Sequence, residues 1–184
     1  MKKLFEFKTS TLVGTALGAS VFTVLFMYVK FPTLIPEVSI QTAYGAGGFF
    51  AAMFGPIAGF ILTFLGHALS DAVQFSEPYW SWIIASGVAG FIIGLVYPQL
   101  HVEDGVFSTR DKILFNAVQL VAHVTAWGVV APLLDVLMYG EPVGLSFIQG
   151  ISAAVSNTIV TGVIGTALLQ LCSKYCASKN IQNN

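Results

Sequence analysis

Six apolar stretches, separated by short polar or proline-containing segments, dominate this chain and limit what it can fold into. They cover residues 10–29, 41–54, 56–74, 80–98, 110–131 and 147–171. A helix needs about 20 apolar residues to cross the hydrocarbon core of a bilayer. Of the 184 residues, 55% are hydrophobic and 9% are charged, so most of the surface must face lipid. The sequence predicts an all-α integral membrane protein with six transmembrane helices in a single domain, residues 1–184.

The second stretch differs from the others because it is short and rich in glycine over residues 45–48. A helix of this kind is expected to be tilted, bent or enclosed by the bundle. Gly55 and Pro56 separate it from the third stretch. Proline fits the first turn of a helix and disfavours helical backbone in the residue before it, which predicts a tight hairpin here.

The Lys and Arg residues predict the orientation of the chain. With both termini in the cytoplasm, seven of the eight basic residues fall on the cytoplasmic side and only Lys30 falls outside. The seven are Lys2, Lys3, Lys8, Arg110, Lys112, Lys174 and Lys179. Because basic residues favour cytoplasmic segments, we expect a multi-pass protein of the cell membrane with both termini cytoplasmic. The external loops would be residues 31–41, 71–82 and 133–146, and the main internal loop residues 97–110.

Several classes of function are disfavoured. The net charge of −1 and the lack of a basic groove argue against a nucleic-acid partner. There is no Walker motif and no loop long enough for an ATPase or receptor domain, so the chain must act within its bundle or through a partner. Cys172 and Cys176 have no zinc-type spacing and no neighbouring His, so core or interface thiols are expected. No metal, cofactor or enzymatic activity is expected.

Polar side chains gather toward the outer half of the predicted bundle. One face of the fifth stretch carries Asn116, Gln119, His123 and Trp127. Polar groups at membrane depth usually face the protein interior or a cavity, so this stripe predicts a lined cavity. The alternative is that Asn116 and Gln119 only bond to neighbouring helices.

Other polar and aromatic residues are expected to converge on the same region. His67 and Asp71 lie one turn apart on the third stretch and can form an internal pair, a two-ligand metal pair or part of a pocket. Trp80 and Trp82 open the fourth stretch from outside, where tryptophan also serves as an interfacial anchor. The further candidates are Tyr79 in the second external loop and Gln149 and Asn157 in the sixth stretch.

Small residues recur at four-residue spacing in most stretches, which lets helix backbones approach closely. For most of them we expect packing within the bundle. The first stretch has few polar pocket candidates, so its face with Gly14 and Gly18, and Ala16 beside it, is predicted to dock another membrane protein.

Two strings of sequence resemble a known family. FGPIAGFILTFLGHALSD in the third stretch and WSWIIASGVAGFIIGL in the fourth, together with the small residues of the first, are similar to the S components of energy-coupling factor (ECF) transporters. The resemblance covers essentially the whole chain and is closest to the riboflavin-type subgroup.

This resemblance implies a small membrane subunit that binds one vitamin from outside and topples in the bilayer to deliver it. It implies partnership with a transmembrane coupling protein and two ATPases. The implied coupling-protein interface is Gly14, Ala16 and Gly18. The implied gate over the ligand is the loop Pro32–Gln41, with Pro32, Pro36 and Gln41 as its residues.

The nature of the vitamin stays open between two candidates. Folate and thiamine pyrophosphate are anionic and would require a buried cation, but the outer half offers only Lys30 besides His67 and His123. Riboflavin suits stacking aromatics combined with Asn and Gln. Cobalamin suits a wide mouth lined by small residues, amides and His, and is narrowly the expected ligand. The remoter alternatives are an intramembrane enzyme using His67, Asp71 and His123, and a stand-alone carrier, although no internal repeat is visible.

Overall fold

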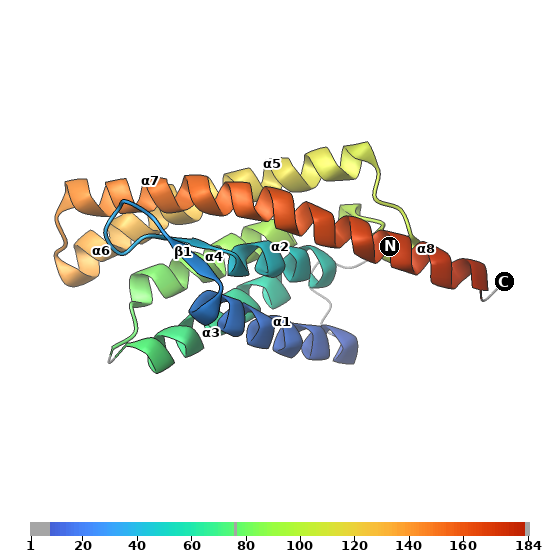
Figure 1. Cartoon of the computed structure of the whole chain (residues 1–184), viewed down its shortest axis with the longest axis horizontal. Coiled ribbons are helices and arrows are strands. Elements are labelled where there is room, and N and C mark those ends of the chain that lie inside the picture. Colours follow the sequence, from blue (N-terminus) through green and yellow to red (C-terminus); the bar gives the residue numbers. More distant parts are fainter. Residues whose placement is uncertain (1–7, 76, 183–184) are drawn as a thin grey trace.

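The computed structural model describes residues 8–75 and 77–182 and is built almost entirely of helices (Figure 1). Lys2 and Lys3, on which the predicted orientation partly depends, lie outside the described residues. The α-helices are α1 (Thr9–Tyr28), α2 (Ala43–Phe54), α3 (Pro56–Gln74), α4 (Trp80–Gly94), α5 (Thr109–Thr125), α6 (Ala131–Tyr139), α7 (Val143–Val160) and α8 (Thr166–Gln182). Two π-helical segments, η3 (Ala126–Val130) and η4 (Thr161–Gly165), join α5 to α6 and α7 to α8.

Five helices among the described residues are long and apolar enough to cross a membrane. They are Thr9–Tyr28, Pro56–Gln74, Trp80–Gln99, Thr109–Tyr139 and Val143–Gln182. Helix α2 has 12 residues, or about 18 Å of helix, and nine of them are buried. As expected for the glycine-rich stretch, α2 is enclosed by the bundle, where it contacts α1, α3, α4 and η4. The chain is thus an integral membrane protein, and a count of six spans stays a prediction.

The predicted hairpin between α2 and α3 is confirmed. Gly55 has a φ of 92°, which favours glycine, and Pro56 is the first residue of α3. The small residues of α3 and α4 pack as expected within the bundle. Gly59 and Gly90 lie so close that a Cβ atom on either would clash with the carbonyl oxygen of the other. These two helices therefore touch along their backbones.

The predicted third external loop, residues 133–146, is wrong. The fifth helix continues through Pro132 to Tyr139, and only residues 140–142 are non-helical. Pro132 is the second residue of α6 and follows directly on the π-helical segment η3, so the helix runs through this proline without a break. Gly140, with a φ of 69°, then ends the helix. The sixth helix likewise extends beyond the predicted residues 147–171, to Val143–Gln182.

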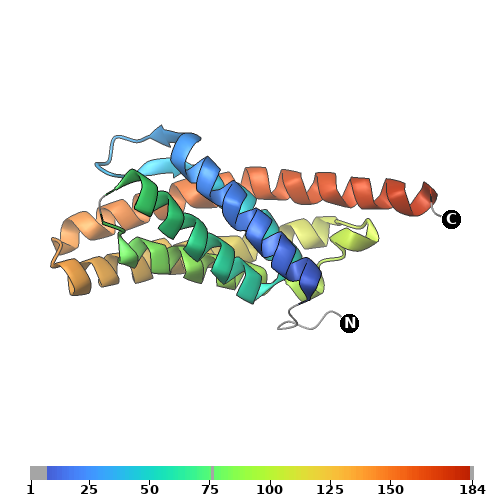
Figure 2. The same ribbon diagram turned by 90° about the horizontal axis from the view of Figure 1, so that it is seen from below.

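The predicted first external loop contains a short antiparallel ribbon that the sequence pattern does not predict. Strand β1 (Lys30–Pro32) pairs with β2 (Ser39–Gln41), with Phe31 opposite Ile40. Between the strands, Thr33 Oγ1 donates to the carbonyl of Val38 at 2.7 Å. Figure 2 shows the ribbon and its connecting loop lying beside α7 at one end of the bundle.

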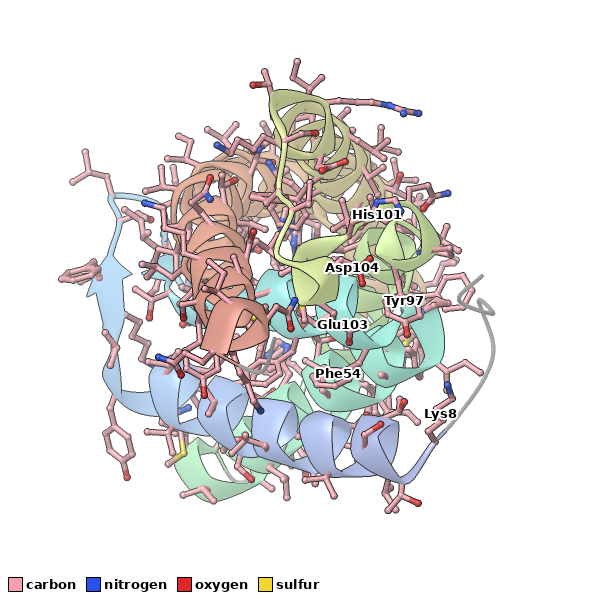
Figure 3. The ribbon with its side chains drawn as sticks, turned by 90° about the vertical axis from the view of Figure 1, so that its right-hand side faces the viewer. Lys8, Phe54, Tyr97, His101, Glu103 and Asp104 are labelled. Carbon is pink, nitrogen blue, oxygen red and sulfur yellow. The ribbon has the colours of Figure 1, made fainter. Side chains whose placement is uncertain are left out.

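The opposite end of the bundle holds the start of α1, the end of α8 and two short 3₁₀ turns, η1 (Tyr97–Gln99) and η2 (Val102–Asp104). Figure 3 looks onto this end, where Tyr97, His101, Glu103 and Asp104 lie near Phe54 and Lys8. Helix α5 begins here with a capping box between Ser108 and Asp111. Both described chain ends thus lie at one end of the bundle, as the predicted topology requires; which side of the membrane this is stays a prediction.

Candidate functional site

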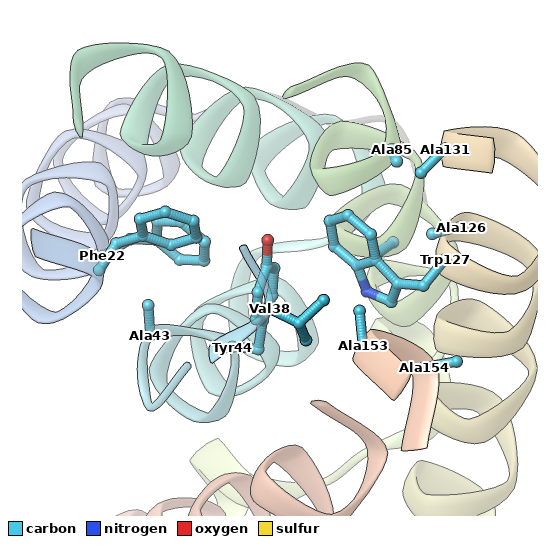
Figure 4. Packing of buried hydrophobic residues seen from close by; sticks show 12 residues of the cluster. Phe22, Val38, Ala43, Tyr44, Ala85, Ala126, Trp127, Ala131, Ala153 and Ala154 are labelled. Carbon is cyan, nitrogen blue, oxygen red and sulfur yellow. The ribbon is translucent and has the colours of Figure 1, made fainter. Parts of the chain in front are cut away.

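Tyr44 of α2 lies at the centre of an aromatic cluster near the ribbon (Figure 4). Its ring meets Phe22 and Trp127 edge-on, with centroids 5.2 Å away in each case, and His123 at 5.8 Å. Its hydroxyl is 2.9 Å from Ser86 Oγ. Tyr44 is absent from the residues that the sequence pattern predicts for the site. The available signal was a lone tyrosine in a stretch of glycine and alanine.

His67 and Asp71 form the pair that their spacing predicts. His67 Nε2 is 3.5 Å from Asp71 Oδ1, and His67 Nδ1 is 2.6 Å from Ser86 Oγ. Ser86 therefore joins His67 to Tyr44. The ring of His67 also contacts Phe26, at 4.3 Å between centroids. Among the described residues there is no group of three or more His, Cys, Asp or Glu side chains that could hold a metal ion.

His123 and Trp127 are fully buried and hydrogen-bonded to each other. Trp127 Nε1 donates to His123 Nδ1 at 3.0 Å. His123 Nδ1 must then be an acceptor, so His123 Nε2 carries the hydrogen and donates to Thr161 Oγ1 at 2.9 Å. Trp127 lies in η3 and Thr161 in η4, so both π-helical segments meet at this cluster. Such segments are frequent at functional sites.

Trp82 completes the cluster from the start of α4. Its ring stacks on Trp127 with centroids 5.5 Å apart and an angle of 24° between the planes. Its Nε1 donates to Asp135 Oδ2 at 2.7 Å, and Ser81 Oγ donates to Asp135 Oδ1. Asp135 is buried, and it also is missing from the predicted site. Asp135 follows Trp127 and Ala131 at four-residue steps on the same helical face. Its place on this face is not predicted because residues 133–146 are expected to form a loop.

The amide side chains of α5 and α7 separate into bonded and unbonded groups. Asn116 Nδ2 donates to the carbonyl of Lys112 and to Thr166 Oγ1, so Asn116 does bond to neighbouring groups. Gln119 Nε2 donates to the carbonyl of Thr158 at 3.3 Å, but its Oε1 has no hydrogen-bond partner in the described chain. Asn157 is 3% exposed, and its Oδ1 likewise has no partner within residues 8–75 and 77–182. Buried amide oxygens of this kind are acceptors without a donor.

The loop between β1 and β2 covers the cluster. Val38 is buried among the aromatic residues, and Gln149 Nε2 of α7 donates to the carbonyl of Pro36 at 3.1 Å. Gln41 Oε1 is buried and has no partner in the described part of the chain. Pro32 is exposed in β1. Of the three residues predicted for a gate, Pro36 thus contacts α7 through its carbonyl, Gln41 is partly buried and Pro32 is exposed; their role as a gate stays a prediction.

Tyr79 and Trp80 lie apart from the cluster, on an outer rim where each is 44% exposed. The ring of Tyr79 faces Tyr139 at 5.5 Å, and Trp80 tilts against Phe64 at 6.3 Å. Partial burial, helped by the nearby carboxylates, foremost that of Glu37, raises the pKa of the Tyr79 phenol. The phenol therefore stays neutral at physiological pH.

Gly14 and Gly18 are covered by the chain itself, which corrects the predicted docking face. A Cβ atom on Gly14 would meet the ring of Phe54, and one on Gly18 the ring of Phe50, both from α2. These glycines let α1 approach α2. Ala16 is exposed and faces away from the bundle.

The wide, small-residue-lined cavity expected from the sequence is not what the cluster shows. The small residues Ala43, Ala85, Ala126, Ala131 and Ala153 belong to the same packed cluster as Tyr44 and Trp127. Two hollows lie elsewhere. One, between α3 and α4, is lined by Ile57, Phe60, Ile61, Val88 and Phe91, and the other involves α4 and α5; neither includes His67, His123 or Trp127.

A helical membrane bundle with an aromatic and amide-bearing cluster under a loop at one end has the form of a membrane protein that binds a small molecule. Residues 6–174 match the family described as ECF-type riboflavin transporter, S component. The chain belongs to this family and is an S component of an ECF vitamin transporter, as the sequence resemblance predicts.

Relatives of similar length match most of the chain. A UPF0397 protein of Streptococcus gordonii is 45% identical over 171 residues, covering 92% of this chain and 91% of the relative. A UPF0397 protein of an Exiguobacterium species is 45% identical over 169 residues, covering 92% of each. The crystal structure of FolT bound with folic acid has a TM-score of 0.62 at 19% identity and covers 86% of this chain and 94% of that one. At this identity the structure shows a shared fold.

Proposed function

We propose that this S component captures riboflavin, or a vitamin of similar planar and uncharged chemistry, in the cluster around Tyr44 and Trp127. The observation that carries the proposal is the combination of stacked indoles with buried amide oxygens that lack a donor. The riboflavin-type family supports the same choice.

The aromatic side chains supply the surface for a planar ring system. Trp82 and Trp127 form a nearly parallel pair, which we name the indole wall. Flat heteroaromatic rings stack favourably on such faces, with a gain of about 0.5–1.5 kcal/mol beyond their area burial. Tyr44 now occupies the centre of the cluster, so ligand entry requires this ring and the loop over it to shift.

The amide oxygens supply acceptors for the polar part of the ligand. An amide buried without a hydrogen bond costs about 1–3 kcal/mol by mutational data. Gln119 Oε1, Asn157 Oδ1 and Gln41 Oε1 are three such acceptors. The hydroxyl and imide N–H groups of riboflavin are donors of the required kind.

The charges of the site disfavour an anionic vitamin. Asp71 and Asp135 are both buried at the cluster. Lys30 is the only Lys or Arg between residues 9 and 109, and its Nζ donates to Gln74 Oε1 at 2.8 Å. A ligand with several carboxylate or phosphate groups would therefore meet two carboxylates here, and the one nearby cation, Lys30, already bonds to Gln74.

Cobalamin, narrowly expected from the sequence, is kept only as the alternative. The comparisons with known proteins give it no support, and the small residues that were expected to open a broad cavity pack against Tyr44 and Trp127 instead. A corrinoid would require a far larger rearrangement of the cluster than a flat tricyclic ring.

For delivery, we propose that the chain works with a transmembrane coupling protein and two ATPases, with six spans and both termini in the cytoplasm. ECF S components act with such partners, and this chain has no ATPase motif of its own. The exposed face of α1 around Ala16 is the surface proposed for docking. The loop between β1 and β2, with Pro36 and Gln41, is proposed as the gate.

Titration of the purified protein with a vitamin panel tests the proposal. We expect submicromolar riboflavin binding that quenches riboflavin fluorescence, with weak or no binding of folate and cobalamin. Tight cobalamin binding without riboflavin binding would establish the alternative. Co-purification of a larger membrane protein and ATP-dependent uptake test the proposed partnership, and uptake that needs neither would point to a stand-alone carrier.

A further inference from the structure

Side chains from two other helices hold the first turn of α4. The backbone N–H of Tyr79 donates to Asp71 Oδ2 of α3 at 3.2 Å. The N–H of Trp80 donates to the hydroxyl of Tyr139 of α6 at 3.0 Å. A helix start leaves such N–H groups without partners inside the helix, so these contacts satisfy them. The position of α4 is therefore fixed against both α3 and α6.

Asp135 of α6 contacts Trp82, which belongs to the proposed vitamin site. Its carboxylate accepts hydrogen bonds from Ser81 Oγ and from Trp82 Nε1. Bonds to a carboxylate are roughly twice as strong as those between neutral groups, and the helix dipole favours a negative charge beside the start of α4. Because an indole has a single N–H, the bond to Asp135 sets the rotation of the Trp82 ring as well as its position.

Both members of the indole wall are held in this way. The indole N–H of Trp82 donates to Asp135, and the indole N–H of Trp127 donates to His123. Their rings lie 5.5 Å apart at 24°. Loss of either acceptor would free one ring to rotate and would remove the flat surface.

We propose that Asp135 is a positioning residue for vitamin binding, which acts through Trp82 by holding its ring against Trp127 and does not itself touch the vitamin. The proposal rests on the proposed function for the identity of the ligand. The orientation of Trp82 is a property of the ligand-free protein, so one experiment tests it without the vitamin.

The first experiment needs no vitamin. The chain has three tryptophans, so a Trp80→Phe background leaves emission from the indole wall alone. In the full-length protein in detergent, Asp135→Leu removes the acceptor and is expected to increase acrylamide quenching of this emission. Asp135→Asn keeps an oxygen acceptor and should quench nearly as the parent does. Glu77→Gln, at an exposed acid in the α3–α4 connection, is the matched control.

The second experiment is a double-mutant cycle with riboflavin. We expect Asp135→Leu to weaken binding about tenfold when Trp82 is present and less than about twofold in a Trp82→Phe background. Asp135→Asn should restore most of the affinity. If Asp135→Leu does not fold, Asp135→Ser, whose hydroxyl is too short to reach the indole, takes its place in both experiments.

Equal losses of affinity in the two backgrounds, or quenching that Asp135→Leu leaves unchanged, would overturn the positioning role. If the parent protein binds no riboflavin but the quenching rises as expected, the proposed ligand fails and the positioning of Trp82 by Asp135 stands. The two failures are therefore distinguishable.

Discussion

Replacing Asn157 by leucine should make the ligand-free protein more stable and its vitamin binding weaker. Asn157 is 3% exposed, and its amide oxygen has no hydrogen-bond partner in the described chain. Leucine has the same number and branching of side-chain heavy atoms and no polar group. Because a buried unpaired polar group costs about 1–3 kcal/mol, the substitution should return an amount of this order to the free energy of unfolding.

Binding should change in the opposite direction. If a vitamin donor bonds to Asn157 Oδ1, its loss should cost about 0.5–1.5 kcal/mol of binding free energy, or about 2- to 13-fold in Kd. The assay is thermal unfolding in detergent with and without riboflavin, together with a titration. The expected pattern is a melting temperature a few degrees higher without ligand and a smaller shift on adding it.

A contrasting variant controls for general packing effects. Asn116→Leu removes an amide that bonds to Lys112 and Thr166, so it should lower the stability of the ligand-free protein. If Asn157→Leu lowered stability as well, Asn157 would be bonded within the protein and the reasoning would be refuted. Unchanged riboflavin affinity in Asn157→Leu would remove Asn157 from the site.

Three further predictions concern packing, the gate and docking. Gly90→Val should place a side chain against the backbone of Gly59 and destabilise the protein by about 1–3 kcal/mol or more. The measurements are protein yield and melting temperature, both of which should fall; a normal melting temperature would contradict the close α3–α4 contact. Gln149→Leu removes the bond to the carbonyl of Pro36 and should speed riboflavin release about 2- to 13-fold in stopped-flow experiments, because one hydrogen bond contributes about 0.5–1.5 kcal/mol. An unchanged release rate would argue against a gate at this loop. Ala16→Trp, on the exposed face of α1, should abolish uptake in cells and leave vitamin affinity within about twofold, since substitutions far from a site act independently of it. Equal loss of uptake and of vitamin affinity would mean that this face is needed for folding or for the vitamin site.

The helices were largely predictable because their limits follow from simple rules. The length and apolar character of the stretches predict the spans, and Gly55-Pro56 predicts the hairpin between α2 and α3. The stripe from Gln119 to Trp127 is also predictable, since a single helical face carries it. The structure brings His123 and Trp127 against the ring of Tyr44, and Ser86 joins His67 to the Tyr44 hydroxyl.

The missing parts of the site have specific physical causes. Pro132 and an acid three residues later are typical of a loop, and the π-helical segment that lets the helix continue through them has no clear sequence signal. Asp135 was hidden for this reason. Tyr44 was hidden because a short glycine-rich stretch indicates packing more than binding.

The direction of a side chain on an apolar helix is the other feature that spacing alone cannot give. Gly14 and Gly18 have the spacing of a docking motif, but two rings from α2 cover them. Tyr79 and Trp80 precede Trp82 by three and two residues, yet they lie on the rim, because α4 begins at Trp80 and turns only Trp82 toward Trp127.

A structure of the riboflavin-bound protein tests the central claim most directly. The account predicts the flavin ring in stacking contact with Trp82 or Trp127, a polar atom of the vitamin within hydrogen-bonding distance of Asn157 Oδ1, and Tyr44 displaced from its present position. Riboflavin bound in the hollow between α3 and α4 beside Phe60 and Phe91, with the cluster around Tyr44 unchanged, would contradict it.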